Sequence, residues 1–183
     1  MTDNGASSYH RFLKGDPAAL EELVSIYGDA LVRFAYCFLS DRYAAEDIME
    51  DAFAALIVRR KSFTDGAKLK AYLFKIARNK CMDALRTRTR YARFNEDVCE
   101  VLFGDAEEDV LKKERNKKLY SALQKLPKTY RETLDLVYLE GFSVAETAAI
   151  LHKNRKQIYN LLARSKRTLK EILEKEGLDN EEF

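Results

Sequence analysis

The sequence is poor in the residues that interrupt helices. It holds 7 glycines and 2 prolines, Pro17 and Pro127, among its 183 residues. The stretches between them are rich in Ala, Leu, Glu, Lys and Arg, which favour helix over strand. A hydrophobic content of 46% is normal for a globular protein. We therefore expect an all-α fold, and the length allows one ordinary domain or two small ones.

Cysteine and histidine are also scarce. Cys37, Cys81 and Cys99 are odd in number, widely spaced and outside any CxxC pattern, so neither a disulfide framework nor a zinc site is indicated. His10 and His152 stand alone, which leaves little for metal or triad chemistry. We expect no cofactor, no metal and no enzymatic activity.

Long apolar runs are missing as well. No stretch approaches the ~18 residues that a membrane-spanning helix needs. The N-terminus lacks the succession of basic, apolar and small residues that marks a signal peptide. We therefore expect a cytoplasmic protein with no membrane insertion.

What the sequence does have is charge, arranged in blocks behind a net charge of only +2. Acids dominate residues 16–51, bases dominate residues 59–93, and NEDVCEVLFGDAEED at 95–109 is acidic again. A second basic block follows at residues 153–170. Two basic surfaces separated by an acidic connector suggest two contacts with a polyanion.

Turn and capping residues divide the chain into two helical parts. Asp16 followed by Pro17 predicts the start of a helix that runs to about Leu39. Ser40 or Asp41 starts a second helix. After the loop KSFTDGAK, a third helix is expected over about 69–88. The first part is thus a bundle of three helices.

We expect two small helical domains joined by a flexible linker. The first domain covers residues 1–93, and the acidic linker covers residues 94–109. A second helical domain covers residues 110–176 and is interrupted at Pro127. Residues 177–183 form an acidic tail.

The second helix of the first domain carries an acidic patch. Asp47, Glu50 and Asp51 are spaced i, i+3 and i+4, which places them on one helix face. They adjoin an apolar stripe that includes Ile48 and Leu56. Taken alone, such a patch is typical of a solvated helix face.

The segment GFSVAETAAILHKNRKQIYNLLARSKRTL, residues 141–169, has the pattern of a helix-turn-helix. Ser143 with Glu146 predicts a capping box, and Asn154 with Gln157 predicts a close relative of one. The turn between the helices is then about three residues, 152–154. This pattern is compatible with a DNA-reading element or with part of a helical core.

The last helix has two chemically different sides. The apolar side holds Ile158, Leu161, Leu162, Ser165, Leu169 and Ile172. The polar side holds Arg155, Lys156, Tyr159, Asn160, Arg164 and Arg167. Because the polar side begins at the N-terminus of the helix, it suits the end of a recognition helix that meets base edges in a major groove.

Three segments, in this order, resemble motifs of one known family. AAEDIMEDAF at 44–53 is similar to the region that binds the clamp helices of the largest polymerase subunit. AYLFKIARNKCMDALR at 71–86 is similar to a promoter-melting helix. LPKTYRETLDLVYLEGFSVAETAAIL at 126–151 is similar to the approach to a region-4 helix-turn-helix. The chain therefore resembles the sigma-70 family, specifically the small extracytoplasmic-function (ECF) sigma factors that keep only regions 2 and 4.

The resemblance implies a function and a set of contacts. The chain would bind core RNA polymerase and direct promoter-specific transcription initiation, with an anti-sigma factor as a further partner. Asp47, Glu50 and Asp51 would contact the polymerase clamp. The minus-10 element of the promoter DNA, duplex and then single-stranded, would be held by Phe63, Tyr72, Lys75, Arg78, Asn79, Arg86, Arg88 and Arg90. The minus-35 element would be read by Arg155, Lys156, Tyr159 and Asn160, with Arg164 and Arg167 nearest phosphate.

The sequence departs from the family pattern at several positions. Tyr72 replaces the usual Trp of the melting helix and keeps an aromatic ring. In the turn, His152 stands where a Gly is usual, and Lys153 stands where an apolar residue is usual. Phe74 follows the apolar Leu73, so we expect this ring to pack in the core.

Two other functions remain open on the residues alone. A free-standing helix-turn-helix regulator would need a dimer interface and would bind duplex DNA unaided. A helical adaptor would use its basic faces to bind acidic proteins and would not select a DNA sequence.

Overall fold

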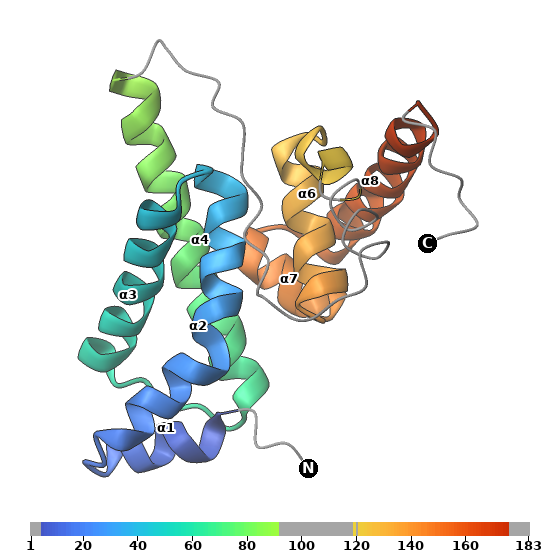
Figure 1. The fold of residues 1–183 in the computed structure, drawn as a ribbon. Coiled ribbons are helices and arrows are strands. Elements are labelled where there is room, and N and C mark those ends of the chain that lie inside the picture. Colours follow the sequence, from blue (N-terminus) through green and yellow to red (C-terminus); the bar gives the residue numbers. More distant parts are fainter. Residues whose placement is uncertain (1–4, 92–118, 120, 176–183) are drawn as a thin grey trace, which may run out of the picture. The chain divides into compact units, whose positions relative to one another are not determined.

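In a computed structural model of the chain, every regular element of the described residues is a helix (Figure 1). The structure describes residues 5–91, 119 and 121–175, with residues 88–91 described by their backbone alone. The fold is all-α with two helical domains, as the sequence predicted. The expected linker, the acidic tail and the three domain boundaries fall outside the described residues.

Four helices are formed by residues 5–91 of the first unit. They are α1 (Ala6–Leu13), α2 (Ala18–Leu39), α3 (Arg42–Arg59) and α4 (Gly66–Tyr91). The helix α2 packs against the other three, and α3 also packs against α4. Figure 1 shows α2, α3 and α4 running alongside one another, with α1 across one end. Large side chains that are fully buried in this unit are Leu23, Leu31, Phe34, Leu56, Leu69, Leu73 and Phe74.

Aspartates start three of these helices. Asp16 Oδ1 accepts a hydrogen bond from the Ala18 amide at 3.1 Å, and Asp41 Oδ1 accepts one from the Ala44 amide at 3.1 Å. Both helix starts were predicted. Asp65 Oδ1 accepts from the amide of Lys68 at 2.8 Å, so α4 begins at Gly66, earlier than expected.

The expectation of three helices in the first domain was wrong, because α1 is a fourth. It has only eight residues, of which Ser8, Tyr9 and Phe12 are buried. An isolated helix of this length is not stable in water. Contacts with distant residues therefore hold α1, and a local sequence pattern does not reveal them.

The second unit is built around two packed helices. Its elements are a helical turn at residues 121–124, α6 (Lys128–Leu134), the π-helix η1 (Asp135–Leu139) and α8 (Arg155–Lys175). The helix α7 (Val144–Leu151) precedes α8 along the chain. α6 packs against α8, and Ala122 packs against Leu173 in a small apolar cluster.

The π-helix η1 follows directly on the last residue of α6. The Glu140 amide donates to the carbonyl of Asp135, five residues back, at 2.9 Å. Two neighbouring side chains of this π-helix, Tyr138 and Leu139, are 54% and 56% exposed. Such π turns are rare and are frequent at functional sites.

Candidate nucleic-acid interface

Both capping boxes predicted in the helix-turn-helix are present. The Ser143 amide donates to Glu146 Oε2 at 2.9 Å, and the Glu146 amide donates to Ser143 Oγ at 3.3 Å. The Gln157 amide donates to Asn154 Oδ1 at 2.8 Å, while the Asn154 amide donates to Gln157 Oε1 at 2.9 Å. Each box satisfies backbone amides that the first turn of a helix leaves unbonded. The start of α8 is therefore well defined.

The turn between α7 and α8 has a left-handed residue. His152 has φ 53°, the conformation in which the resemblance would place a Gly. The next amide, that of Lys153, donates to the carbonyl of Ala148 at 2.9 Å and closes the end of α7. The turn thus keeps the expected backbone although its glycine is missing.

The two sides of α8 differ in burial, as predicted. On the apolar side Ile158, Leu162 and Ser165 are buried, whereas Leu161, Leu169 and Ile172 are half-buried. Ser165 Oγ donates to the Leu161 carbonyl at 2.6 Å, so this buried hydroxyl is satisfied within the helix. The predicted polar side is solvent-exposed at every position, namely Arg155, Lys156, Tyr159, Asn160, Arg164 and Arg167.

The basic side chains of this face differ in their neighbours. Arg167 Nε lies 3.2 Å from Glu171 Oε1, one helical turn further on. Arg155, Lys156 and Arg164 pair with no acid among residues that the structure describes. Three cationic groups are therefore available to an anionic partner without displacing an internal carboxylate.

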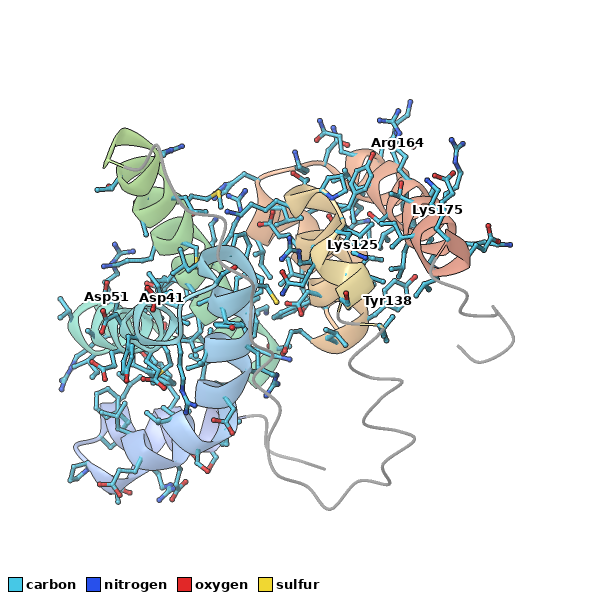
Figure 2. The ribbon with its side chains drawn as sticks, turned by 45° about the horizontal axis from the view of Figure 1, so that its top comes forward. Asp41, Asp51, Lys125, Tyr138, Arg164 and Lys175 are labelled. Atoms are coloured by element: carbon cyan, nitrogen blue, oxygen red, sulfur yellow. The ribbon has the colours of Figure 1, made fainter. Side chains whose placement is uncertain are left out.

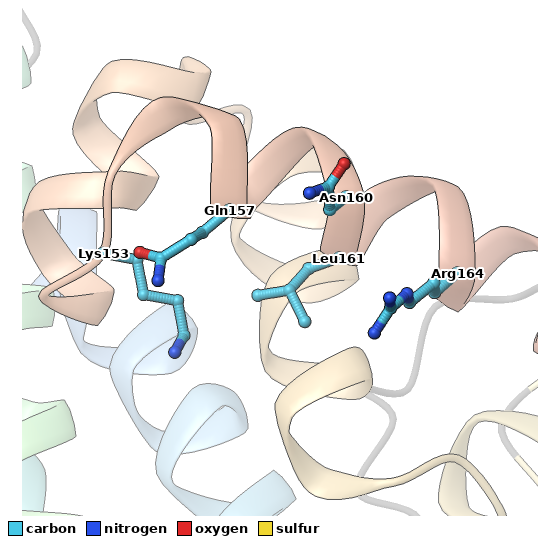
Figure 3. Close-up of a pocket in the computed structure, with 5 residues that line it drawn as sticks. All are labelled: Lys153, Gln157, Asn160, Leu161 and Arg164. Carbon is cyan, nitrogen blue, oxygen red and sulfur yellow. The ribbon is translucent and has the colours of Figure 1, made fainter.

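A hollow of about 240 Å³ runs along one flank of α8 (Figure 3). Its lining residues are Lys153, Gln157, Asn160, Leu161 and Arg164. Figure 3 shows Leu161 between Lys153 and Arg164 on the same side of the helix. Sequence reasoning did not select Lys153 or Gln157 as contacts. The signal that could have found Lys153 is its positive charge in the turn directly before α8.

The acidic patch lies on the solvent side of α3. Asp47, Glu50 and Asp51 are all exposed, while Ile48 beside them is buried (Figure 2 labels Asp51). Asp51 has an internal partner, because its Oδ2 lies 2.7 Å from Lys80 Nζ on α4. The sequence grouped the three acids correctly on one face but gave no sign of this ion pair.

The basic residues predicted on α4 are not equally accessible. Asn79 and Arg86 are exposed, whereas Lys75 and Arg78 are half-buried. Arg86 Nη1 lies 3.2 Å from Asp83 Oδ1. The side chains of two further predicted contacts, Arg88 and Arg90, lie outside the described residues.

The rings near the start of α4 form a chain of contacts. Phe63 is half-buried, with its ring centroid 5.5 Å from that of Tyr9 and 5.1 Å from that of Tyr72. Lys61 Nζ lies 5.4 Å from the centroid of the Tyr72 ring. Phe74 is fully buried and packs against Phe34, so its expected role in the core is confirmed.

Tyr9 is the member of this cluster that sequence reasoning missed. Its hydroxyl donates to the carbonyl of Lys61 at 2.8 Å. Burial raises the pKa of Tyr9 above its ordinary value of 10.0, and the nearby Tyr72 adds to this while Arg60 opposes it. The hydroxyl therefore keeps its proton near neutral pH and remains a donor.

Neither metal chemistry nor a membrane helix is evident in the part of the chain that the structure describes. Within residues 5–91 and 121–175 no three His, Cys, Asp or Glu side chains are grouped so that they could hold a metal ion. The same residues contain no helix long and apolar enough to cross a bilayer.

The chain combines a helix-turn-helix with a separate helical bundle. A capped helix-turn-helix whose second helix exposes a basic face is an arrangement for reading duplex DNA. Here it shares a chain with a helical bundle that exposes separate acidic and basic faces. These features are those of a DNA-binding protein of the helix-turn-helix class that has further charged surfaces on a second helical unit.

Comparisons with known proteins place the chain more closely. Residues 23–91 match the family model of Sigma-70 region 2, and residues 116–169 match that of Sigma-70 region 4. The chain is 30% identical to the ECF RNA polymerase sigma factor SigW of Bacillus subtilis, covering 76% of this chain and 80% of that protein. It is 26% identical to SigM of the same organism, covering 88% of this chain and 99% of that protein.

A solved structure agrees. The sigma factor RpoE of Bartonella quintana, determined in complex with the anti-sigma factor NepR, superposes with a TM-score of 0.69 at 28% identity. The match covers 84% of this chain and 96% of that one. The chain belongs to the ECF sigma factors of the sigma-70 family and functions in transcription initiation. Sigma factors bind core RNA polymerase and promoter DNA and are non-enzymatic regulators.

Proposed function

We propose that this chain directs core RNA polymerase to promoters by reading the minus-35 element with α8 and by melting the minus-10 element with its first unit. The observation that carries the proposal is the exposed outer face of α8, which starts at a doubly hydrogen-bonded cap. The protein then acts in the cytoplasm, as a subunit without catalytic chemistry of its own.

At the minus-35 element, the first two turns of α8 lie nearest the bases. Arg155, Lys156, Tyr159 and Asn160 occupy these turns and are exposed. Arg and Lys donate well to guanine and Asn donates and accepts well at adenine, while a tyrosine ring offers apolar contact. Arg164 and Arg167 follow one to two turns later, where phosphate contacts fix the register of the helix.

Opening the minus-10 element requires energy to unstack its bases. The sequence contains no P-loop motif that would bind a nucleotide for hydrolysis, so we propose that binding energy opens the DNA. Stacking of an unpaired base on an aromatic side chain contributes ~1–3 kcal/mol, which is comparable to the cost of unstacking it. Phe63 and Tyr72 are the proposed rings. The strand backbone and bases would be held by Lys75, Arg78, Asn79, Arg86, Arg88 and Arg90.

The polymerase contact is proposed at the acidic patch of α3. Asp47, Glu50 and Asp51 are exposed on one face, which suits basic helices of the polymerase clamp. Since these are surface charges, the contact should weaken as salt rises.

An anti-sigma factor is the proposed regulator. The related RpoE of Bartonella quintana was solved with the anti-sigma factor NepR. A protein of this class that covered either the acidic patch or the outer face of α8 would keep the sigma factor from its polymerase or its promoter.

Run-off transcription with purified core polymerase on a pool of genomic fragments tests the proposal. We expect start sites that depend on the protein and that share a minus-35 and a minus-10 element. A free-standing regulator would instead bind duplex DNA without polymerase, and an adaptor would select no DNA sequence. Absence of protein-dependent transcripts contradicts the proposal.

The polymerase contact has its own test. The double variant Asp47→Lys with Asp51→Lys should abolish binding to core polymerase in an anisotropy titration. Glu21→Lys with Asp29→Lys makes the same change in net charge at exposed positions of α2 and should bind normally. If the two double variants bind equally well, the patch on α3 is a solvated surface.

A further inference from the structure

The segment between α3 and α4 is held by a side chain from the far end of the first unit. Tyr9 of α1 is 2% exposed, and its hydroxyl donates to the Lys61 carbonyl at 2.8 Å. The bonded residues are 52 positions apart in the sequence. The Tyr9 ring also packs against Phe63, which in turn packs against Tyr72. One side chain therefore contacts both the backbone and a ring of this segment.

Further contacts fix both ends of the segment. Arg60 ends α3 in a left-handed conformation with φ 43°, and its guanidinium lies 5.9 Å from the centroid of Phe12 on α1. At the other end, Asp65 caps α4 and the Tyr27 hydroxyl lies 3.5 Å from the Gly66 carbonyl. Between these anchors, Ser62 and Thr64 are exposed while Phe63 turns inward.

The hydroxyl of Tyr9 has a role that its ring cannot fill. A phenylalanine at this position would still pack against Phe63 and Phe12. Only the hydroxyl fixes the carbonyl of Lys61, and with it the backbone that carries Lys61 and Phe63 beside Tyr72. A buried donor held by one acceptor gives a defined position to the group that it binds.

We infer that Tyr9 is a positioning residue for capture of the melted promoter strand: α1 holds Lys61 and Phe63 in place, so that Phe63 and Tyr72 form a ready-made surface for an unstacked base. The inference rests on the proposed function of Phe63 and Tyr72. Its physical basis is preorganisation, since a loop that is ordered before binding loses less conformational entropy on binding.

The test compares strand capture with the other activities of the same holoenzyme. The probe is a fluorescent single-stranded oligonucleotide that carries the non-template minus-10 sequence of a promoter mapped in the run-off experiment. Tyr9→Phe removes the hydrogen bond and keeps the ring, and should weaken binding of this strand about two- to tenfold. Tyr9→Leu removes the ring as well and should weaken it further. Tyr43→Phe, the same chemical change at an 80% exposed site, should have no effect.

Three further readouts separate positioning from simple loss of folding. For Tyr9→Phe, affinity for core polymerase and affinity for minus-35 duplex DNA should stay near the values of the unmodified protein. The thermal midpoint should fall by no more than the loss of one hydrogen bond accounts for. Permanganate reactivity of thymines in the promoter should fall together with strand affinity. A parallel loss of polymerase and strand affinity would mean that Tyr9 supports the whole domain, and this would overturn the inference.

Alanine variants keep this inference distinguishable from the function on which it rests. If Phe63→Ala and Tyr72→Ala leave strand affinity unchanged, the proposed ring surface itself is wrong. If both variants lose strand affinity while Tyr9→Phe retains it in full, the ring surface stands and the role of Tyr9 is refuted.

Discussion

Lys80 Nζ on α4 lies 2.7 Å from Asp51 Oδ2 on α3. The ion pair connects the acidic patch of α3, which we propose to contact polymerase, with α4, which we propose to contact the minus-10 element. Both side chains are about half-exposed, at 42% for Lys80 and 50% for Asp51. An ion pair of this kind contributes little to stability, about 0–1 kcal/mol. It does mean that one of the three carboxylates in the patch is partly neutralised before polymerase arrives.

Removing Lys80 should therefore strengthen the polymerase contact. We expect Lys80→Gln to raise affinity for core polymerase by less than about fivefold, because the freed Asp51 then adds its full charge to the patch. Anisotropy titrations at low and high salt measure this, and the gain should shrink at high salt. Lys14→Gln is the matched control, with the same loss of charge at an exposed site on the first unit. Weaker binding of Lys80→Gln than of this control would contradict the prediction.

The cap of α8 should matter to stability and to DNA binding together. Asn154→Ala removes the side-chain acceptor of the Gln157 amide, and such a change destabilises a helix by about 0.5–2 kcal/mol. Urea unfolding should show this loss, and minus-35 duplex affinity should fall equally for specific and mismatched sequences. Asn154→Asp retains an acceptor and should keep most of the stability. A change in base preference in Asn154→Ala would argue that Asn154 reads the DNA directly.

Two arginines on α8 should differ in what they recognise. Arg155→Ala should cost ~1–3 kcal/mol at one upstream base pair and relax specificity there, as expected for a bidentate contact with a base. Arg164→Ala should weaken all sequences alike and lower the slope of log affinity against log salt by about one. Duplex titrations of the holoenzyme on single-base-pair variants at several salt concentrations measure both effects. If Arg155→Ala weakened binding to all sequences equally, Arg155 would be assigned to a phosphate contact and not to a base contact.

Replacing His152, the left-handed residue of the turn, by glycine should increase the stability of the protein. His152 has φ 53°, which is strained for a residue with a Cβ atom. His152→Gly should stabilise the helix-turn-helix by about 0.5–1 kcal/mol after the greater chain entropy of glycine is subtracted. His152→Val should destabilise it, because β-branched side chains tolerate this backbone poorly. Urea unfolding measures both, and a destabilised glycine variant would mean that the imidazole makes a contact worth more than the strain.

Local features of the fold were predictable from the sequence. The caps at Asp41, Ser143 and Asn154 depend on residues three positions away, so a short pattern contains all the necessary information. The division of α8 into a buried and an exposed side follows in the same way from the 3.6-residue period. The site residues on α8 were grouped correctly for this reason, although their DNA contacts stay a prediction.

Features that depend on distant partners were not predictable. The helix α1 is short, and the contacts of Tyr9 and Phe12 with the segment after α3 come from residues about fifty positions away. The pairing of Lys80 with Asp51 requires the packing of α4 on α3, which no local pattern specifies. The ring of Phe63 likewise contacts Tyr9, which is distant in the sequence, so the loop pattern around Phe63 did not reveal this packing.

The π-helix Asp135–Leu139 has a consequence for how this domain tolerates insertions and deletions. A π turn holds one residue more than an α turn, so it is equivalent to a one-residue insertion that the helix has absorbed. Deleting one residue here would therefore restore a regular helix and leave the segments that follow in the same direction relative to α6. Deleting a second residue, from the regular helix that results, would rotate everything that follows by about 100°. The helix-turn-helix would then face a different direction, with each of its own hydrogen bonds intact. We therefore expect the segment between Pro127 and Ser143 to tolerate the loss of one residue and not of two.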